Sequence, residues 1–208
     1  MSEFWESSFR DKNTMWGFEP ADAALATLKL FKEHHLEKIL IPGFGYGRNA
    51  KPFIDAGFKV TGIDISKTAI HLARKHYGSN ITIHHGPVSA MPFDQELYDG
   101  IFCYALIHLL DEEERIKLID DCYKQLRPDG YMVFVAVSKN DAMYGSGKEV
   151  SKNRFENRHG VRLFFYDSNA VEKEFGRYGL IESKEIDEPV ENMGNRPSLK
   201  FWQIICQK

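Results

Sequence analysis

The chain has 208 residues, of which 43% are apolar and 27% are charged, and its formal net charge at pH 7 is −3. This length is enough for one domain with a buried core and requires no second domain. No apolar run approaches the roughly 20 residues that span a bilayer, and residues 1–20 lack the basic and apolar regions of a signal peptide. We therefore expect a single cytoplasmic domain over residues 1–208, with no membrane partner and no overall charge that favours nucleic acid.

Helices and strands are predicted to alternate along residues 21–137. Apolar stretches of strand length are separated by longer amphipathic stretches, and Ser66 has the side chain of a helix N-cap. The expected strands cover residues 38–42, 59–63, 81–85, 99–104 and 131–137. The expected helices cover residues 21–35, 47–56, 66–77 and 111–126, and a turn at 127–130 leads into the fifth strand. Strict alternation with apolar strands indicates a parallel sheet covered by helices on both faces.

The rest of the chain has a different composition. Residues 138–162 are polar and basic with little apolar periodicity, so we expect 138–166 to form a lid-like insertion over one edge of the sheet. A further helix is expected to end near Tyr178. Two last strands, over 180–188 and 199–207, are joined by a turn at 189–197, and the last strand is expected to return antiparallel.

Three glycines, Gly43, Gly45 and Gly47, follow the first strand, and Asp64 stands at the end of the second. Glycine at a strand-to-helix turn lets the backbone approach a ligand closely, and an acid about 20 residues further on can hold two ribose hydroxyls. The pattern indicates a nucleoside-binding unit. Plain turn glycines, and an aspartate that only caps the next helix, are the structural alternatives.

A dinucleotide fingerprint requires a third glycine where this chain has Arg48. This weakens the prediction of a nicotinamide-dependent (NAD) oxidoreductase, which remains an alternative. The pattern from Gly43 to Asp64 instead resembles motif I and the acidic loop of the class I S-adenosylmethionine (SAM)-dependent methyltransferases. Three later segments resemble the adenine loop, the segment facing the transferable methyl group and the turn before strand five of that family: residues 85–93, 97–109 and 126–130.

The resemblance covers almost the whole chain. It implies an α/β, Rossmann-like fold with a seven-stranded, mostly parallel sheet, helices on both faces and an antiparallel last strand. The start of the chain and the Ile41-Pro42-Gly43 form of motif I resemble the thiopurine and thiol methyltransferases, and residues 164–189 resemble the tellurite-resistance methyltransferases. Both branches act on small molecules, often on soft nucleophiles such as sulfur.

SAM is the cofactor that the resemblance implies. Residues 1–36 are expected to cover its site, with Trp16 either packing beside the cofactor or serving only as a core aromatic residue. The chain departs from the family at Ile41 and Pro87, where acids are usual, so other groups must hold the methionine ammonium and the adenine amino group. The predicted cofactor-binding residues are Trp16, Gly43, Phe44, Gly45, Gly47, Asp64, Ile65, Val88, Ser89 and Tyr104.

Tyr104 and His108 are the predicted catalytic residues, because they follow the fourth strand, whose carboxyl end faces the ligand crevice of such a sheet. An ordinary histidine accepts a proton near neutral pH, so His108 is a candidate general base or substrate-orienting residue, with a structural histidine as the alternative. The predicted substrate-binding residues, for which solvent exposure or core packing is the alternative, are Arg154, Arg158, Phe165 and Tyr166.

Neither a metal site nor a disulfide is expected. The histidine pairs at 34–35 and 84–85 are adjacent, so their side chains point apart instead of converging on one ion. Cys103, Cys122 and Cys206 stand in apolar stretches that are typical of buried thiols.

The predicted function is SAM-dependent methyl transfer to a small-molecule acceptor, a thiol or another soft nucleophile, by a monomer or homodimer. A nucleic-acid methyltransferase would be expected to carry an Asn/Asp-Pro-Pro-Tyr/Phe motif where this chain reads Cys103-Tyr104-Ala105-Leu106, so no nucleic-acid partner is expected. A non-catalytic SAM-binding protein is the remaining alternative.

Overall fold

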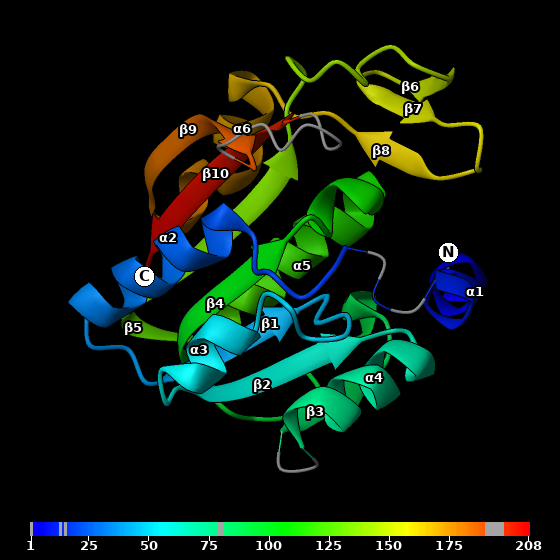
Figure 1. Cartoon of the computed structure of the whole chain (residues 1–208). Coiled ribbons are helices and arrows are strands. Elements are labelled where there is room, and N and C mark those ends of the chain that lie inside the picture. The colour runs from blue at the N-terminus through cyan, green and yellow to red at the C-terminus, as the bar shows by residue number, and fades with distance from the viewer. Residues whose placement is uncertain (1, 13, 15, 79–80, 190–197) are drawn as a thin grey trace.

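The computed structural model describes residues 2–12, 14, 16–78, 81–189 and 198–208. They form a seven-stranded sheet in the order β3-β2-β1-β4-β5-β10-β9 and a separate three-stranded sheet in the order β6-β7-β8 (Figure 1). The strands of the large sheet are β1 (Lys38–Pro42), β2 (Lys59–Asp64), β3 (Thr82–His85), β4 (Tyr98–Tyr104), β5 (Leu126–Val137), β9 (Leu180–Glu188) and β10 (Leu199–Gln207). The predicted α/β fold with a seven-stranded sheet is confirmed.

The parallel strands of the large sheet run in the same direction, so their ends lie at one edge of the sheet. β1 pairs in parallel with β2 and β4, and the pairs β2–β3 and β4–β5 are also parallel. β10 runs antiparallel to both of its neighbours, β5 and β9, which confirms the predicted antiparallel last strand. Most of the predicted turn between these last strands, residues 190–197, lies outside the described residues. Segments that follow the parallel strands therefore gather at one edge of the sheet.

Helices lie on both faces of the large sheet (Figure 1). They are α1 (Ser2–Lys12), α2 (Asp22–Glu33), α3 (Lys51–Asp55), α4 (Lys67–Tyr77), α5 (Glu112–Gln125) and α6 (Ser168–Phe175). Because alternate side chains of a strand point to opposite faces, β5 divides the core into two clusters. Val133 and Val135 belong to the cluster that holds residues of α2, α3 and α4. Met132 and Phe134 belong to the cluster that holds residues of α5 and α6.

Two helices begin at caps that satisfy their first N–H groups. The predicted cap Ser66 is confirmed, because its Oγ accepts a hydrogen bond from Ala69 N at 3.0 Å. Asp111 begins α5 with a capping box, in which Glu114 N donates to Asp111 at 2.9 Å and the Glu114 carboxylate accepts from Asp111 N at 3.1 Å. No helix within the described ranges is both long and apolar enough to cross a membrane.

The three cysteines of the chain are free thiols. Cys103, Cys122 and Cys206 are all buried, and burial raises the pKa of each thiol. The prediction of buried thiols is confirmed.

Two predicted boundaries differ from the structure by four or five residues. The helix expected from residue 47 begins only at Lys51, because Gly47 has a φ of +88°, a value outside the helical range. The turn expected at 127–130 is instead part of β5. Asp129 has a φ of +63° there and donates its N–H to Lys208 O at 2.8 Å, while the register with β4 shifts. These residues form a bulge that also pairs with the last residue of the chain.

The basic stretch after β5 contains strands that the sequence did not predict. They are β6 (Lys148–Ser151), β7 (Arg154–Glu156) and β8 (Arg162–Phe164). Strands of three or four residues are too short to show a reliable alternation of apolar and polar side chains. Phe155 holds this small sheet to the body, because its buried ring lies 5.2 Å from the ring of Tyr144 and 6.0 Å from that of Phe165.

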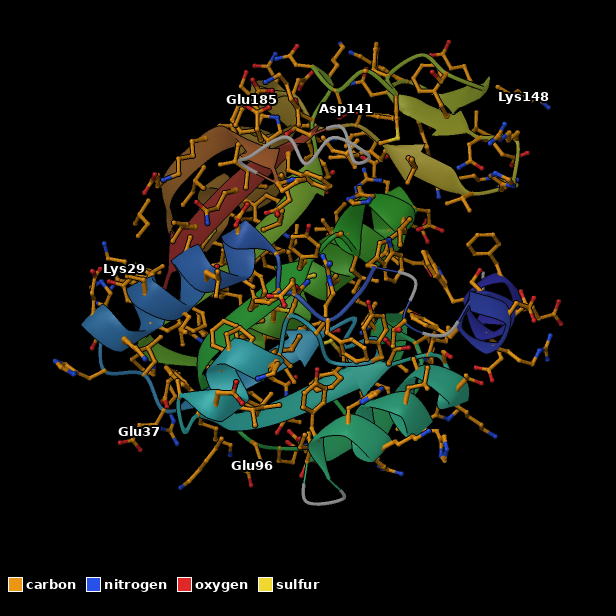
Figure 2. The ribbon with its side chains drawn as sticks, viewed as in Figure 1. Lys29, Glu37, Glu96, Asp141, Lys148 and Glu185 are labelled. Atoms are coloured by element: carbon orange, nitrogen blue, oxygen red, sulfur yellow. The ribbon has the colours of Figure 1, made fainter. Side chains whose placement is uncertain are left out.

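The beginning of this insertion is fixed to the last two strands. Figure 2 labels the two carboxylates concerned, Asp141 and Glu185, at the same end of the molecule. Asp141 accepts a hydrogen bond from Lys200 N at 2.7 Å. Glu185 accepts hydrogen bonds from Ser138 Oγ and, at 3.0 Å, from Asn140 Nδ2. These hydrogen bonds therefore fix the position of the start of the insertion relative to β9 and β10.

Candidate active site

A cavity of about 1330 Å³ opens at the edge of the large sheet where the parallel strands end. Its lining comes from α1, from the segments after β1 to β5, from the start of β10 and from the insertion. It brings together His108 and all ten residues that the sequence predicts as cofactor-binding: Trp16, Gly43, Phe44, Gly45, Gly47, Asp64, Ile65, Val88, Ser89 and Tyr104. The roles of these residues remain predictions, but their positions allow them to act on one ligand.

The glycine turn is tied to the second strand. Gly43 N and Phe44 N both donate to Ile63 O, at 2.9 and 3.0 Å, which places the turn beside the end of β2. Gly43, Gly45 and Gly47 have φ values of +74°, +58° and +88°, a region that favours glycine. A Cβ at Gly47 would also lie 2.6 Å from the ring of Tyr77. Glycine at these positions therefore allows both the turn conformation and close packing, and the turn lines the cavity.

Asp64 has a second task that its place in the sequence did not reveal. One carboxylate oxygen accepts a hydrogen bond from Gly45 N at 2.6 Å, and the other accepts one from Ser66 N at 2.8 Å. Asp64 is only 8% exposed, and burial raises the pKa of its carboxyl group against the opposing effect of these two N–H groups. An ionised carboxylate has about four acceptor positions, so two remain for ribose hydroxyls. The residues present fit the nucleoside end of SAM.

The helix α1 was not predicted, although residues 1–36 were expected to cover the site. It lies against α4 and contributes Phe4, Trp5, Ser8 and Phe9 to the cavity lining. Glu6 accepts hydrogen bonds from Ser66 Oγ and Thr68 Oγ1, both at 2.6 Å, and these bonds lower the pKa of its carboxyl group to about 2. The spacing of Trp5 and Phe9 by four residues is the signal that could have predicted this helix.

Trp16 lies in the cavity wall between this helix and the glycine turn. Its indole stacks on Tyr46 with ring centroids 6.3 Å apart and an interplanar angle of 12°. The Phe9 ring meets both of them nearly edge-on, at 6.0 and 6.2 Å. The aromatic cluster gives this side of the cavity a flat apolar surface that is suited to an adenine ring or a sulfonium group.

His108 is placed in the cavity, but its hydrogen bonding argues against the predicted general base. Its Nδ1 accepts the N–H of Val137 at 3.2 Å, so the proton of the neutral ring resides on Nε2. Burial lowers the pKa of this histidine to about 4, which keeps the ring neutral at physiological pH. The free nitrogen already carries a proton and can only donate. The predicted role as a substrate-orienting residue is the one that fits.

Tyr104 is likewise a donor. Burial first, and then the nearby Glu188, raise the pKa of its phenol well above the ordinary value, and the Arg48 guanidinium opposes this only in part. Its ring stacks on Phe201 with centroids 6.1 Å apart. At neutral pH the phenol therefore keeps its proton and cannot act as a base.

The four predicted substrate-binding residues do not line the cavity. Phe165 is buried against Phe155, and Tyr166 is buried with its hydroxyl donating to Glu174 at 2.7 Å. Arg158 is exposed, and burial and the charge of a neighbouring arginine lower the pKa of Arg154. The cavity lining therefore gives no support to these four predictions, since the side chains of Phe165 and Tyr166 are buried in the core and that of Arg158 is exposed.

Other residues of the insertion reach the cavity in their place. They are Asn157, His159, Val161 and Leu163, which sequence reasoning missed. Together with residues after β4 and β5 and at the start of β10 they form what we call the apolar chamber. Its apolar side chains are those of Leu106, Leu109, Leu110, Val137, Met143, Val161, Leu163, Leu199 and Phe201. The cavity thus has a nucleoside end at Asp64 and an apolar chamber beside His108.

Comparison with known proteins supports SAM as the cofactor. Residues 39–130 match a family described as a methyltransferase domain. A thiocyanate methyltransferase of Brassica oleracea is 26% identical over 156 residues, which cover 73% of this chain and 69% of that protein. A tRNA N(3)-methylcytidine methyltransferase of Drosophila melanogaster is 22% identical over 230 residues, which cover 99% of this chain and 69% of that protein.

A solved structure extends the likeness to the whole fold. It is the 1,6-didemethyltoxoflavin-N1-methyltransferase of Burkholderia thailandensis with bound S-adenosylhomocysteine, which covers 100% of this chain and 86% of its own, with a TM-score of 0.75 and 17% identity. The matched domain runs from β1 to the beginning of β5 and includes the glycine turn and Asp64. The matched domain and the strand order agree, and the chain is a SAM-dependent methyltransferase with a Rossmann-like fold.

Proposed function

We propose that this methyltransferase acts on a small, largely apolar acceptor that presents a soft nucleophile, a thiol in the first place. The observation that carries the proposal is the apolar chamber, whose walls are formed by leucine, valine, methionine and phenylalanine side chains. Such a surface binds a carbon-rich ligand better than a phosphate or a carboxylate, because a buried charge requires paired partners.

The protonation states of Tyr104 and His108 favour a thiol over a hydroxyl or an amine. Both side chains keep their protons at neutral pH, and the Nε2 of His108 is a donor. Neither can accept a proton from an alcohol. A thiol has an ordinary pKa of about 8.5, so it ionises to a useful extent without a base.

The residues of the cavity then have separate tasks. When bound, SAM supplies a methyl group that its sulfonium already activates. Asp64 holds the nucleoside end, and the glycine turn lets the backbone approach it. The apolar chamber keeps water from the acceptor, and His108 orients the acceptor by donating from Nε2. Alignment and exclusion of water are the contributions of the protein.

The charges near the cavity support a small molecule over tRNA, the substrate of one relative. The chain has a formal net charge of −3, and the first turn of α5 carries Glu112, Glu113 and Glu114, of which Glu114 lines the cavity. Binding of a nucleic-acid backbone is driven by Lys and Arg side chains that neutralise phosphates. The Glu114 carboxylate at the cavity, with Glu112 and Glu113 beside it in the same helical turn, would repel such a backbone.

Transfer of a labelled methyl group tests the proposal. The protein is incubated with methyl-labelled SAM and, separately, with alkyl and aryl thiols, the matching alcohols and amines, and unmodified tRNA. We expect label in thioether products, little in the alcohol products and none in tRNA. Label in tRNA alone would overturn the proposal.

Two variants of the small sheet make the test specific for the apolar chamber. Leu163→Asp places a charge in the chamber and should lower kcat/KM for the thiol by about 10²-fold, given about 3 kcal/mol for an unpaired buried polar group. Val150→Asp is the matched control, because Val150 lies on β6 of the same sheet and is 41% exposed. It should keep the wild-type kcat/KM, and equal losses in both variants would count against the chamber.

A further inference from the structure

The cavity must also satisfy the charged end of the cofactor. The amino-acid end of SAM carries an ammonium and a carboxylate, which need opposite charges when they are taken out of water. Ile41 at the end of β1 is buried and apolar, so it can supply neither charge. The charges must come from elsewhere in the lining.

One carboxylate in the cavity lies far from the glycine turn in sequence. Glu188 ends β9 and is 7% exposed. Its two carboxylate oxygens accept hydrogen bonds from Asp22 N at 3.0 Å and Ala23 N at 2.9 Å, at the beginning of α2. These bonds fix the carboxylate in place and leave about two acceptor positions free. The side chain of Asp22 also lines the cavity and lies close enough to raise the pKa of Glu188.

A guanidinium lies near both this carboxylate and Tyr104. Arg48 follows the last glycine of the turn, lines the cavity and donates from Nη1 to Trp16 O at 3.0 Å. Burial raises the pKa of both Tyr104 and Glu188, and the nearby charge of Arg48 opposes this rise in both. A guanidinium has five N–H donors, so Arg48 can still hold a carboxylate.

We propose that Glu188 with Asp22, together with Arg48, form a clamp for the α-amino-acid end of SAM. Glu188 and Asp22 receive the ammonium, and Arg48 receives the carboxylate. The clamp supplies the charges that Ile41 cannot, and it joins residues that are 140 positions apart, from Arg48 to Glu188. It concerns the cofactor alone, so its failure would leave the proposed acceptor untouched.

Two ligands that differ only in the amino-acid end test the clamp. S-adenosylhomocysteine carries this end, whereas 5′-methylthioadenosine has the same nucleoside without it. Calorimetric titration of Glu188→Gln should show S-adenosylhomocysteine binding weakened by about tenfold or more, and 5′-methylthioadenosine binding within about twofold of wild type. Glu182→Gln, an exposed glutamate on the same strand, is the matched control and should bind both ligands as the wild type does.

Two results for Glu188→Gln would contradict the clamp. Unchanged S-adenosylhomocysteine binding, or an equal loss for both ligands in a folded variant, would mean that Glu188 only caps α2, and would overturn the clamp. Arg48→Met, titrated with the same two ligands, decides the matter if Glu188→Gln does not fold. Selective loss of S-adenosylhomocysteine binding in Arg48→Met supports the clamp, and an unchanged ratio of the two affinities overturns it.

Discussion

Asp64 illustrates how a single residue links the fold to the ligand. The sequence predicts a carboxylate for ribose, and the structure adds that the same carboxylate holds the backbone N–H groups of Gly45 and Ser66. A ribose-binding acid that moved freely would have to be ordered at the moment of binding. Here the glycine turn and the start of α4 order it in advance.

Replacing Asp64 by alanine should therefore affect binding and stability together. Loss of two hydrogen bonds to ribose should weaken S-adenosylhomocysteine binding by at least about tenfold, given about 1.5–3 kcal/mol for each bond to a charged group. The unpaired N–H groups of Gly45 and Ser66 should lower the free energy of unfolding by about 1–3 kcal/mol. Calorimetry and urea unfolding measure the two effects, and a folded variant with wild-type affinity would refute the assignment.

His108 should make stability depend on pH in a defined window. Its pKa is about 4 in the folded protein against an ordinary value of 6.5, so the unfolded chain binds the additional proton between these pH values. Stability should therefore fall as the pH drops from 6.5 to 4, by at most about 3 kcal/mol from this residue.

The variant His108→Asn isolates this contribution. The asparagine oxygen can still accept the N–H of Val137, but it does not titrate. The loss of unfolding free energy between pH 7 and pH 4.5 should be smaller in the variant than in the wild type. Identical pH dependence in the two proteins would show that His108 is not held neutral by burial.

The sequence predicted the positions of those cavity residues that lie shortly after the end of a strand. Gly43, Asp64 and His108 lie a few positions after a predicted strand, and parallel strands bring such positions to one edge. The tautomer of His108 depends on Val137, which is 29 residues away in sequence, and the environment of Glu188 depends on α2, which is more than 160 residues away. Contacts between residues so far apart in the sequence leave no local pattern from which they could be predicted.

At the scale of elements, α1 is attached to the rest of the site through the start of α4 and a cluster of aromatic side chains. Glu6 fixes it to the start of α4, and aromatic contacts from Trp5 and Phe9 complete the attachment. We infer that α1 is a cover whose attachment controls how long the cofactor stays bound. Figure 1 shows α1 at the periphery of the molecule, on the side of α4.

Glu6→Gln should loosen this cover. The neutral amide is a weaker acceptor for Ser66 and Thr68, so the amides of α1 should exchange hydrogen several-fold faster, and S-adenosylhomocysteine should dissociate faster. Because the pKa of Glu6 is lowered to about 2, its contribution to stability is present above pH 4.5 and is lost as the pH falls toward 2. Glu3→Gln, on the exposed side of the same helix, is the control. Equal exchange rates in Glu6→Gln and Glu3→Gln would remove Glu6 from the attachment.

Also at the scale of elements, the insertion contains short strands where the sequence predicted a loop. Its strands hold three or four residues each, and the buried Phe155 fastens the sheet to the body. The composition of 138–162 correctly suggested a segment outside the core sheet, but pairing between β6, β7 and β8 is not visible in composition. The consequence for function is that Val161 and Leu163, and not the arginines, face the cavity.

At the scale of the whole molecule, both parts of the candidate site lie at one edge of the sheet. The ends of β1 and β2 form the nucleoside end, and the ends of β4 and β5 with the insertion form the apolar chamber. The sequence predicted the mostly parallel sheet and its antiparallel last strand, because alternating elements leave few possible topologies. The shape of the chamber, which decides the acceptor, depends on the insertion and on β10 and was not predictable in the same way.

A crystal structure with S-adenosylhomocysteine bound tests the central claim most directly. We expect the ribose hydroxyls on the carboxylate of Asp64, the amino-acid end between Glu188 and Arg48, and the sulfur facing the apolar chamber beside His108. A ligand bound elsewhere, or bound with its ribose away from Asp64 and its sulfur turned from the chamber, would contradict this account of the site.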